Sequence, residues 1–269
     1  MAKILAVPSM ADRLRARFGI ETISAPVTDD GDVFIRWGNS SGDFRRVVNP
    51  ARAIRLNCRK YDALVAISQV TRTPRIYRGF IPRGIRAVVR PLTHSQGEGF
   101  QVIDGPRDIS DSQYATAYVE TDVEHRVFFA WDCLFFARRR GTDDQRAAQF
   151  PCRSNWGYEF STEGPEALKE AVRKARQAIG LEVGAADTLT KDGEHYILEL
   201  NSGPSVDHDR ITAFYKDGLR RGIQRKHGVD ITNSPLPGHA ATMSLEERVS
   251  ELTREVRELR EIIDGWPRR

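Results

Sequence analysis

The chain has 269 residues, 40% of them apolar and 29% charged, so it can fold around a sizeable core and is not of the disordered class. No apolar run approaches the roughly 20 residues that a membrane helix needs, and no membrane partner is expected. A net charge of +4 would allow polyanion binding, but so small an excess is typical of a solvated surface, and nucleic acid is not expected as a partner.

The first 48 residues give the weakest signal. The segments 3–7 and 33–37 are predicted strands, separated by loops rich in Gly, Asp, Ser and Asn. Asn49-Pro50 then opens a single helical pattern of apolar residues that reaches Ile67. Lys60 lies within this pattern, and by itself it is an ordinary surface lysine.

Between residues 74 and 103, short β-rich runs alternate with Pro and Gly. One of them ends in Arg90-Pro91 and leads into a loop that contains Gly97 and Gly99. Glycines allow backbone N–H groups to turn toward an anion, and a cation neutralises it, so this pattern is compatible with phosphate binding. Many hairpin loops also carry two glycines, and the Walker pattern is absent.

Two further strands are predicted at residues 114–119 and 125–138. The second ends in three consecutive arginines, 138–140, which are interpreted as solvated surface. Residues 165–179 form a strongly amphipathic pattern with a proline at its start and Gly180 after its end, which predicts a helix.

The next stretch predicts a β-hairpin with a turn around Asp192-Gly193. Alternation along its second strand places Ile197, Glu199 and Asn201 on one face. Asp187 joins them if the turn has an odd number of residues, whereas a two-residue turn would place it on the opposite face.

Carboxylate and amide oxygens on one face are ligands that suit magnesium, which keeps water and phosphate oxygens as its other ligands. The alternative is a solvated acidic face of an ordinary hairpin, and the residues of the hairpin alone favour that alternative.

The end of the chain predicts a separate element. Residues 233–243 have the composition of a linker. In residues 244–266, six apolar residues alternate in steps of four and three, as in a coiled coil that forms a parallel homodimer. The alternative is a helix packed on its own domain. The predicted coiled-coil positions are Leu245, Val249, Leu252, Val256, Leu259 and Ile263.

The order of these features resembles the ATP-grasp ligases, and within them the RimK-type glutamate ligases, over residues 49–206. No single motif is specific, but the set in this order is. The motifs are Glu124-His-Arg126, Arg153-Ser154-Asn155, Gly184-Ala-Ala-Asp187 and Leu198-Glu-Leu-Asn201-Ser-Gly-Pro204.

The resemblance implies a role for each matching residue. Nucleotide phosphates would be held by Lys60, Arg90 and the loop of Gly97 and Gly99. The adenine and ribose would be held by Tyr118, Val119 and Glu124. The transferring phosphoryl group would be surrounded by Arg126, Arg153 and Asn155. Magnesium or manganese would be bound by Asp187, Glu199 and Asn201.

The chain departs from the pattern of these ligases in three ways. Arg90 stands in place of a lysine, and Ala117 in place of an acidic hinge residue. The region before residue 49 is much shorter than the usual preceding domain, which leaves the acceptor substrate undetermined.

The resemblance implies an α+β ATP-grasp fold, with two α+β subdomains that clasp ATP. The expected domains are a reduced N-terminal domain at 1–48, the ATP-grasp domain at 49–232, the linker and the C-terminal coiled-coil helix. The three scattered cysteines indicate neither a disulfide framework nor a zinc site and are typical of a cytoplasmic protein.

The function that follows is an ATP-dependent carboxylate–amine ligase that works through an acyl phosphate and releases ADP. Its substrates would be ATP, a carboxylate and an amine, on a small molecule, a peptide or a protein tail. The alternative is a dimeric nucleotide- or nucleic-acid-binding scaffold that keeps this fold without turnover.

Overall fold

The computed structural model describes residues 1–25, 31–92, 99–121, 123–140 and 157–231. The chain divides into two compact units, Met1–Ser234 and Pro235–Arg269. The predicted linker and coiled-coil helix lie outside the described residues, so both stay predictions. None of the helices in the described ranges is long and apolar enough to cross a membrane.

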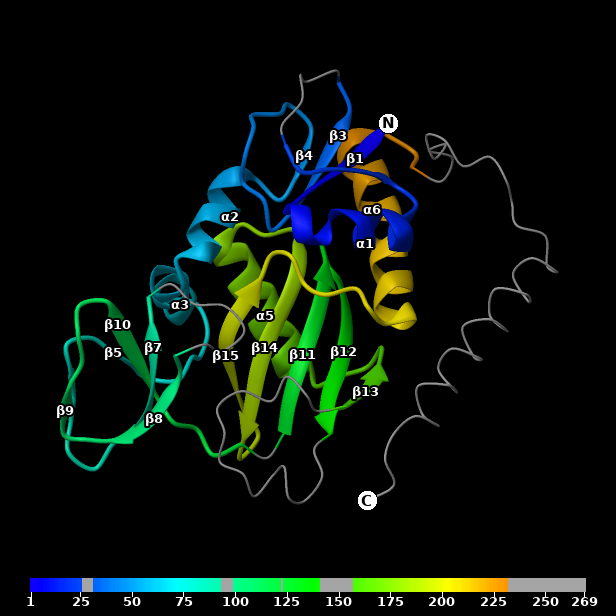
Figure 1. Cartoon of the computed structure of the whole chain (residues 1–269). Coiled ribbons are helices and arrows are strands. Elements are labelled where there is room, and N and C mark those ends of the chain that lie inside the picture. Colours follow the sequence, from blue (N-terminus) through cyan, green and yellow to red (C-terminus); the bar gives the residue numbers. More distant parts are fainter. Residues whose placement is uncertain (26–30, 93–98, 122, 141–156, 232–269) are drawn as a thin grey trace, which may run out of the picture. The chain divides into compact units, whose positions relative to one another are not determined.

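The N-terminal residues form a small parallel sheet with the strand order β2-β1-β3-β4 (Figure 1). Its strands β1 and β3 confirm the strands predicted at 3–7 and 33–37. A helix that the sequence did not predict lies between the first two strands. The elements are β1 (Ala2–Ala6), α1 (Pro8–Phe18), β2 (Glu21–Ile23), β3 (Val33–Trp37) and β4 (Val47–Val48).

The helical pattern that begins after Asn49 is two helices, where the sequence predicted one. They are α2 (Ala51–Cys58) and α3 (Lys60–Ser68). Arg59 has φ −84° and ψ 79°, outside the helical region, and this breaks the chain between them. Lys60 therefore begins α3 and does not lie in the middle of a helix.

A second sheet is antiparallel, with the order β5-β10-β7-β8, and a two-stranded ribbon, β6-β9, lies in the same stretch of chain. The predicted strand at 114–119 corresponds to β10. The strands are β5 (Ile76–Tyr77), β6 (Phe80–Ile81), β7 (Arg86–Pro91), β8 (Gln101–Asp104), β9 (Arg107–Asp108) and β10 (Gln113–Ala117).

The largest sheet has five antiparallel strands in the order β13-β12-β11-β14-β15. The single strand predicted at 125–138 is wrong: the chain reverses at Trp131-Asp132, and Trp131 adopts a positive φ of 51°. The strands are β11 (Val123–Ala130), β12 (Cys133–Arg140), β13 (Gly157–Ser161), β14 (Val183–Lys191) and β15 (Glu194–Asn201).

One face of this sheet is covered by the helix α5 (Glu166–Ile179), which confirms the amphipathic helix predicted there (Figure 1). The helix ends at Gly180, which has the left-handed φ of 82° that glycine adopts without steric cost. The sheet contributes Val127, Phe129 and Leu200 to this core, and all three are almost fully buried.

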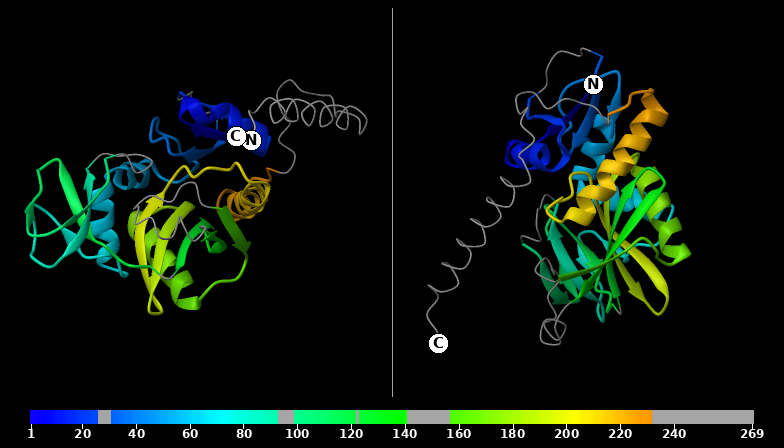
Figure 2. Two further views of the ribbon diagram at one scale, coloured as in Figure 1. Left: turned by 60° about the horizontal axis from the view of Figure 1, so that its bottom comes forward. Right: turned by 90° about the vertical axis from the view of Figure 1, so that its right-hand side faces the viewer.

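The opposite face is apolar at one end and polar at the other. At the apolar end, Phe128 and Val183 pack with the N-terminal strands and with α6 (Asp209–His227), a helix that the sequence did not predict. This helix runs along both sheets (Figure 2). Its Tyr215 is fully buried and donates a hydrogen bond of 2.6 Å to the carbonyl oxygen of Gly184.

Candidate functional site

The β14–β15 hairpin brings Asp187 opposite Glu199, but not by the route that the sequence analysis required. The turn has two residues, because Lys191 pairs with Glu194. A regular ladder would then place the two carboxylates on opposite faces. A β-bulge prevents this: Thr188 pairs with Ile197 and Asp187 with Glu199, so Leu198 is an extra residue in β15.

The bulge also corrects the predicted face of Ile197. This side chain was expected beside Glu199 and Asn201, but it is fully buried in the core that contains Leu200 and α5. Because one residue is inserted between them, Ile197 and Leu200 share a face at a spacing of three instead of two.

The three predicted metal ligands are confirmed as neighbours on one face. The side-chain amide of Asn201 donates to Asp187 Oδ2 at 3.0 Å and lies 3.4 Å from Glu199 Oε1. Asp187 Oδ1 is buried and accepts no hydrogen bond within the described ranges. An oxygen of this kind can take a cation as its partner.

The donor set fits a hard divalent cation that also binds phosphate oxygens. Two carboxylates and one amide oxygen, offered by a flip of the Asn201 side chain, leave positions for water and phosphate, as magnesium prefers. Nowhere in the described part of the chain do three or more His, Cys, Asp or Glu side chains gather as a complete protein cage.

Three cationic side chains, those of Lys60, Arg126 and Arg139, surround these acids. Lys60 Nζ lies 3.6 Å from Glu199 Oε2 and donates to the carbonyl oxygen of Leu200 at 2.8 Å. Arg126 Nε lies 3.8 Å from Asp187 Oδ1. Arg126 is directly opposite Asp187 in the β11–β14 ladder, which is why the two side chains share a face.

Arg126 is held in its charged form. Burial by itself lowers the pKa of this guanidinium, but the charges of Asp187 and Glu199 and a hydrogen bond with Tyr158 outweigh burial and raise it. A permanently charged guanidinium with a carboxylate on one side is suited to a second anionic group on the other.

Arg139 is a site residue that the sequence analysis missed, because it was interpreted as part of a solvated basic cluster. Its side chain is only 13% exposed and lies 3.5 Å from Asp187 Oδ1 and 3.9 Å from Glu124 Oε2. The available signal was alternation: Ala137 lies opposite Arg126, and Arg139 is two residues further along the same face.

A pocket next to this cluster is lined by four of the residues predicted to bind nucleotide, which are Arg90, Tyr118, Val119 and Glu124. Arg90 belongs to β7 of the second sheet, and Glu124 belongs to β11 of the large sheet. Tyr118 and Val119 belong to the segment that follows β10. The bulged Leu198 lines the same pocket, so one irregularity positions both the acids and an apolar wall.

Arg90 is the cation among the residues that line this pocket. Its side chain is largely buried, its guanidinium lies 5.0 Å from the centre of the Phe100 ring, and its Nε has no hydrogen-bond partner in the described residues. Burial raises the pKa of the neighbouring Tyr114, and the charge of Arg90 opposes that rise. Tyr114 therefore remains a neutral phenol that keeps Arg90 in place.

The connecting segment after β10 has unequal backbone hydrogen bonding. The N–H of Ala117 donates to the carbonyl oxygen of Arg75 at 2.8 Å, and the N–H of Tyr118 donates to that of Arg86 at 2.8 Å. The N–H of Val119 donates no hydrogen bond to any of the described residues. That group can donate to a ring nitrogen of a base, independently of the alanine at residue 117.

Of the remaining predicted site residues, only Gly99 is described. Its φ is 71°, and a Cβ added there would lie 2.9 Å from Pro91 Cγ, so both conformation and space require glycine. Gly97, Arg153 and Asn155 lie outside the described residues, and their roles stay predictions.

No family model matches the chain, and no curated protein matches its sequence. Solved structures do. The macrocyclase MdnC bound with its precursor peptide MdnA, from Microcystis aeruginosa MRC, has 10% identity and a TM-score of 0.51, over 82% of this chain and 100% of that one.

Two more structures agree. A RimK domain ATP-grasp protein from Sphaerobacter thermophilus DSM 20745 has 13% identity and a TM-score of 0.52, over 81% of this chain and 99% of that one. The ATP-grasp ligase PsnB, complexed with minimal precursor, Mg and ADP, has 14% identity and a TM-score of 0.53, over 82% and 96%. The chain has the ATP-grasp fold, as the order of its motifs predicted.

Proposed function

We propose that this protein is an ATP-dependent carboxylate–amine ligase. One observation carries the proposal: Asp187, Glu199 and Asn201 face a common point between Arg126 and Lys60, beside a pocket lined by the predicted nucleotide residues. An acidic cluster that adjoins a pocket with apolar and cationic walls and is flanked by cations is the arrangement that a metal-bound nucleoside triphosphate requires.

In this proposal, ATP lies along the pocket. The adenine packs between apolar residues such as Leu189 and Leu198 and receives a hydrogen bond from the N–H of Val119. Glu124 accepts hydrogen bonds from the ribose hydroxyls. Arg90 contacts the phosphates, and its guanidinium can bind two phosphate oxygens at once, which a lysine cannot.

Asp187, Glu199 and Asn201 would hold magnesium, or manganese, next to the terminal phosphates. Bound there, the metal supplies positive charge that offsets the charge of the phosphate oxygens. Binding would also give Asp187 Oδ1, which accepts no hydrogen bond among the described residues, a close partner. PsnB, which was solved with Mg and ADP, supports this choice of cofactor.

The reaction needs no protein nucleophile. A substrate carboxylate oxygen attacks the γ-phosphorus of ATP, the bond to the β-phosphate oxygen breaks, and ADP leaves. An amine then attacks the acyl phosphate, loses a proton and displaces inorganic phosphate. Arg126 and Arg139 would stabilise the charge on the transferring phosphoryl oxygens, together with Arg153 and Asn155 as the resemblance implies.

Besides ATP, the proposed substrates are a carboxylate and an amine, carried on a small molecule, a peptide or a protein tail. Two of the structurally similar ligases, MdnC and PsnB, were solved with precursor peptides, which supports a peptide. A cytoplasmic location and a homodimer through residues 244–266 complete the proposal.

The test is the chemical identity of the products. The purified chain is incubated with Mg·ATP, pooled amino acids and peptides, and hydroxylamine, which traps an acyl phosphate as a hydroxamate. We expect ADP and hydroxamate to accumulate together. AMP with pyrophosphate would show an adenylating enzyme instead, and the ligase mechanism would be abandoned.

The matched variants are Arg126→Ala and Arg107→Ala, the latter an exposed arginine of β9. Loss of one contact to the developing charge typically lowers turnover about 100- to 1,000-fold. We expect that loss for Arg126→Ala alone, with partial rescue by Arg126→Lys. Equal activity of the two alanine variants would remove Arg126 from the reaction.

A further inference from the structure

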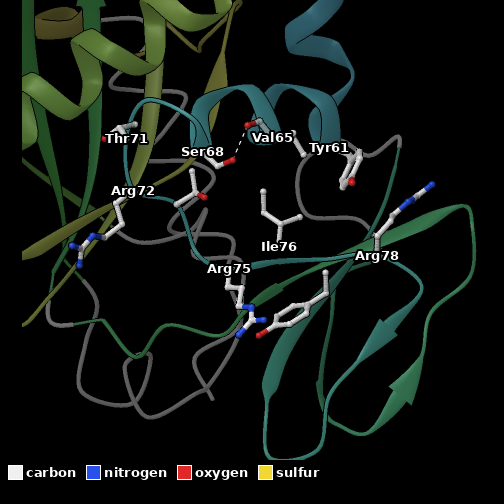
Figure 3. Close-up of a pocket in the computed structure, with 10 residues that line it drawn as sticks. Tyr61, Val65, Ser68, Thr71, Arg72, Arg75, Ile76 and Arg78 are labelled. Atoms are coloured by element: carbon white, nitrogen blue, oxygen red, sulfur yellow. Dashed lines mark hydrogen bonds between the residues drawn. The ribbon is translucent and has the colours of Figure 1, made fainter.

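A second concave surface lies away from the acidic cluster, between α3 and β5 (Figure 3). This arginine groove has a volume of about 530 Å³, within the range of ligand pockets. Val65 of α3 and Ile76 of β5 line it, with the hydroxyl side chains of Ser68 and Thr71 beside them. Arg72, Arg75 and Arg78 stand at its edges.

The chain around the groove carries an unbalanced charge. Residues 63–97 contain six arginines and no Asp or Glu. The arginines of the groove follow one another at every third residue, and all three are exposed. A row of exposed cations on a stretch of chain without acidic residues attracts an anionic partner.

The guanidinium groups of Arg78 and Arg75 are held in place by different contacts. Arg78 lies 5.0 Å from the centre of the Tyr61 ring and donates to the carbonyl oxygens of Asp111 and Gln113. Arg75 lies 5.4 Å from the centre of the Tyr77 ring. Contact with an aromatic face fixes a guanidinium without using its N–H donors, so those of Arg75 remain available for an anion.

Arg72 already pairs with an acidic side chain of the protein. Its Nη1 forms an ion pair of 2.8 Å with Glu194, and both side chains are about half exposed. Arg75 has no carboxylate partner among the described residues, and its side chain makes no hydrogen bond there. The groove therefore has an unpaired cation between two that are engaged.

We propose that the arginine groove binds an acidic peptide segment of a partner protein. Carboxylates of the peptide pair with Arg75 and the outer edges of Arg72 and Arg78, and one apolar side chain packs over Val65 and Ile76. Figure 3 shows Ile76 pointing toward α3 while Arg72 and Arg78 point outward at opposite ends. An apolar centre with a charged edge is the general form of a protein-binding surface.

Single-stranded nucleic acid fits this surface poorly. Its bases need free aromatic faces on which to stack. Tyr77 is only 7% exposed, and Tyr61 lies against Arg78 and makes an edge contact of 5.7 Å with Tyr114. Phosphates could pair with the arginines, but the bases would find no platform.

The groove shares its wall with the proposed nucleotide pocket. The carbonyl oxygen of Arg72 accepts from the N–H of Ile197 at 3.0 Å, that of Arg75 accepts from Ala117, and Pro74 between them lines the pocket. A peptide bound here would lie against the segment that frames the base, although its binding requires no turnover.

The test uses the full chain and a short fluorescein-labelled peptide of repeated Glu-Leu-Glu-Ser units, with fluorescence anisotropy as the readout. We expect saturable binding that weakens with rising NaCl, because exposed charge pairs are screened by salt. The same peptide with Lys in place of Glu should not bind. Failure of the acidic peptide to bind, or tighter binding of an oligo-dT strand, would overturn the proposal.

Arg75→Glu and Arg107→Glu form the matched pair, since both replace an exposed arginine by an acid. We expect about tenfold weaker peptide binding for Arg75→Glu and no change for Arg107→Glu, as reversal of one exposed charge contact implies. Val65→Thr, which keeps the shape of the side chain, should also weaken binding. Equal affinity of the two charge variants would overturn the assignment.

The Mg·ATP thermal shift, measured on the same proteins, separates this proposal from the ligase proposal. Arg75→Glu should lose peptide binding and keep the shift. A chain that binds the peptide but shows no Mg·ATP shift would contradict the ligase alone.

Discussion

The two faces of the five-stranded sheet show how one set of strands divides stability from chemistry. The face against α5 is mostly apolar, and Phe129, Ile197 and Leu200 are fully or almost fully buried there. The polar end of the other face carries Asp187 and Glu199 among cations. Neighbouring residues on one strand therefore have different environments: Glu199 lies in the polar cluster, and Leu200 lies in the apolar core.

The polar cluster is costly in a way that the apolar core is not. Charges partly removed from water repay their desolvation only through good pairing, and here the distances between cations and carboxylates are 3.5 to 3.8 Å. Such loose pairing contributes little to folding. In the proposed function, this loose pairing lets the acids exchange their partners within the protein for a metal, and lets the cations exchange theirs for phosphates.

The largest expected effect tests the apolar face. Leu200→Ala removes a side chain that is only 1% exposed, and we expect the free energy of unfolding to fall by about 2–5 kcal/mol. Glu199→Gln, one residue earlier, should change it by less than about 1 kcal/mol. Urea unfolding measures both. Equal losses would mean that the two faces are not separate.

The second effect tests the polar face. With ligand at a hundredfold excess over Kd, Mg·ATP should stabilise the wild-type chain by about 2.7 kcal/mol, and Asp187→Asn should remove most of this gain. The control, Asp192→Asn, makes the same change in the turn of the same hairpin and should keep the gain. The measurement is a thermal-shift titration. A full gain in the Asp187→Asn variant would refute the metal assignment.

A smaller effect separates two adjacent arginines. Arg139 points to the acidic cluster, whereas Arg138 is exposed and lies on the other side of the strand. Arg139→Gln should lower kcat/KM about tenfold, as expected for loss of one charged hydrogen-bond partner. Arg138→Gln should leave it unchanged. Steady-state kinetics under identical conditions measures kcat/KM for both variants. Equal values would contradict the assignment of Arg139 to the site.

The smallest effect is a pH dependence on the apolar side of the sheet. Burial, with the nearby charges of Arg138 and His195, lowers the pKa of His125 to about 4. In the unfolded chain its pKa is near 6.5, so between these values only the unfolded state binds the proton, and stability falls as the pH falls. We expect a loss of about 1 kcal/mol between pH 7 and 5, after allowance for solvent screening.

His125→Gln should remove this part of the pH dependence. Urea unfolding of both chains at several pH values measures it. Overlapping pH profiles for His125→Gln and the wild-type chain would show that the ring does not titrate as described.

The sequence by itself determined the parts that depend on local pattern. The 3.6-residue periodicity of residues 165–179 predicted α5, and turn residues predicted the β14–β15 hairpin. The ordered motif set predicted the ATP-grasp fold and the meeting of Asp187, Glu199 and Asn201. These features are encoded within a few residues, or in a spacing that the fold preserves.

The tertiary structure decided what depends on partners distant in sequence. The turn chemistry at Asp192-Gly193 predicts a two-residue turn, which alone would separate Asp187 from Glu199. Only the bulge at Leu198 reunites them, and it exists because Ile197 and Leu200 both pack against α5 while Leu198 lines the pocket. Packing on both faces at once fixes such an insertion, and one strand's own pattern does not contain it.

Arg139 follows the same rule. Three consecutive arginines look alike in the sequence, and alternation alone does not say which face will carry acids. The β11–β12 register places Arg139 on the face of Asp187 and Glu124. Its partners come from two other strands, so its environment was set when the sheet assembled, through contacts that no local sequence pattern specifies.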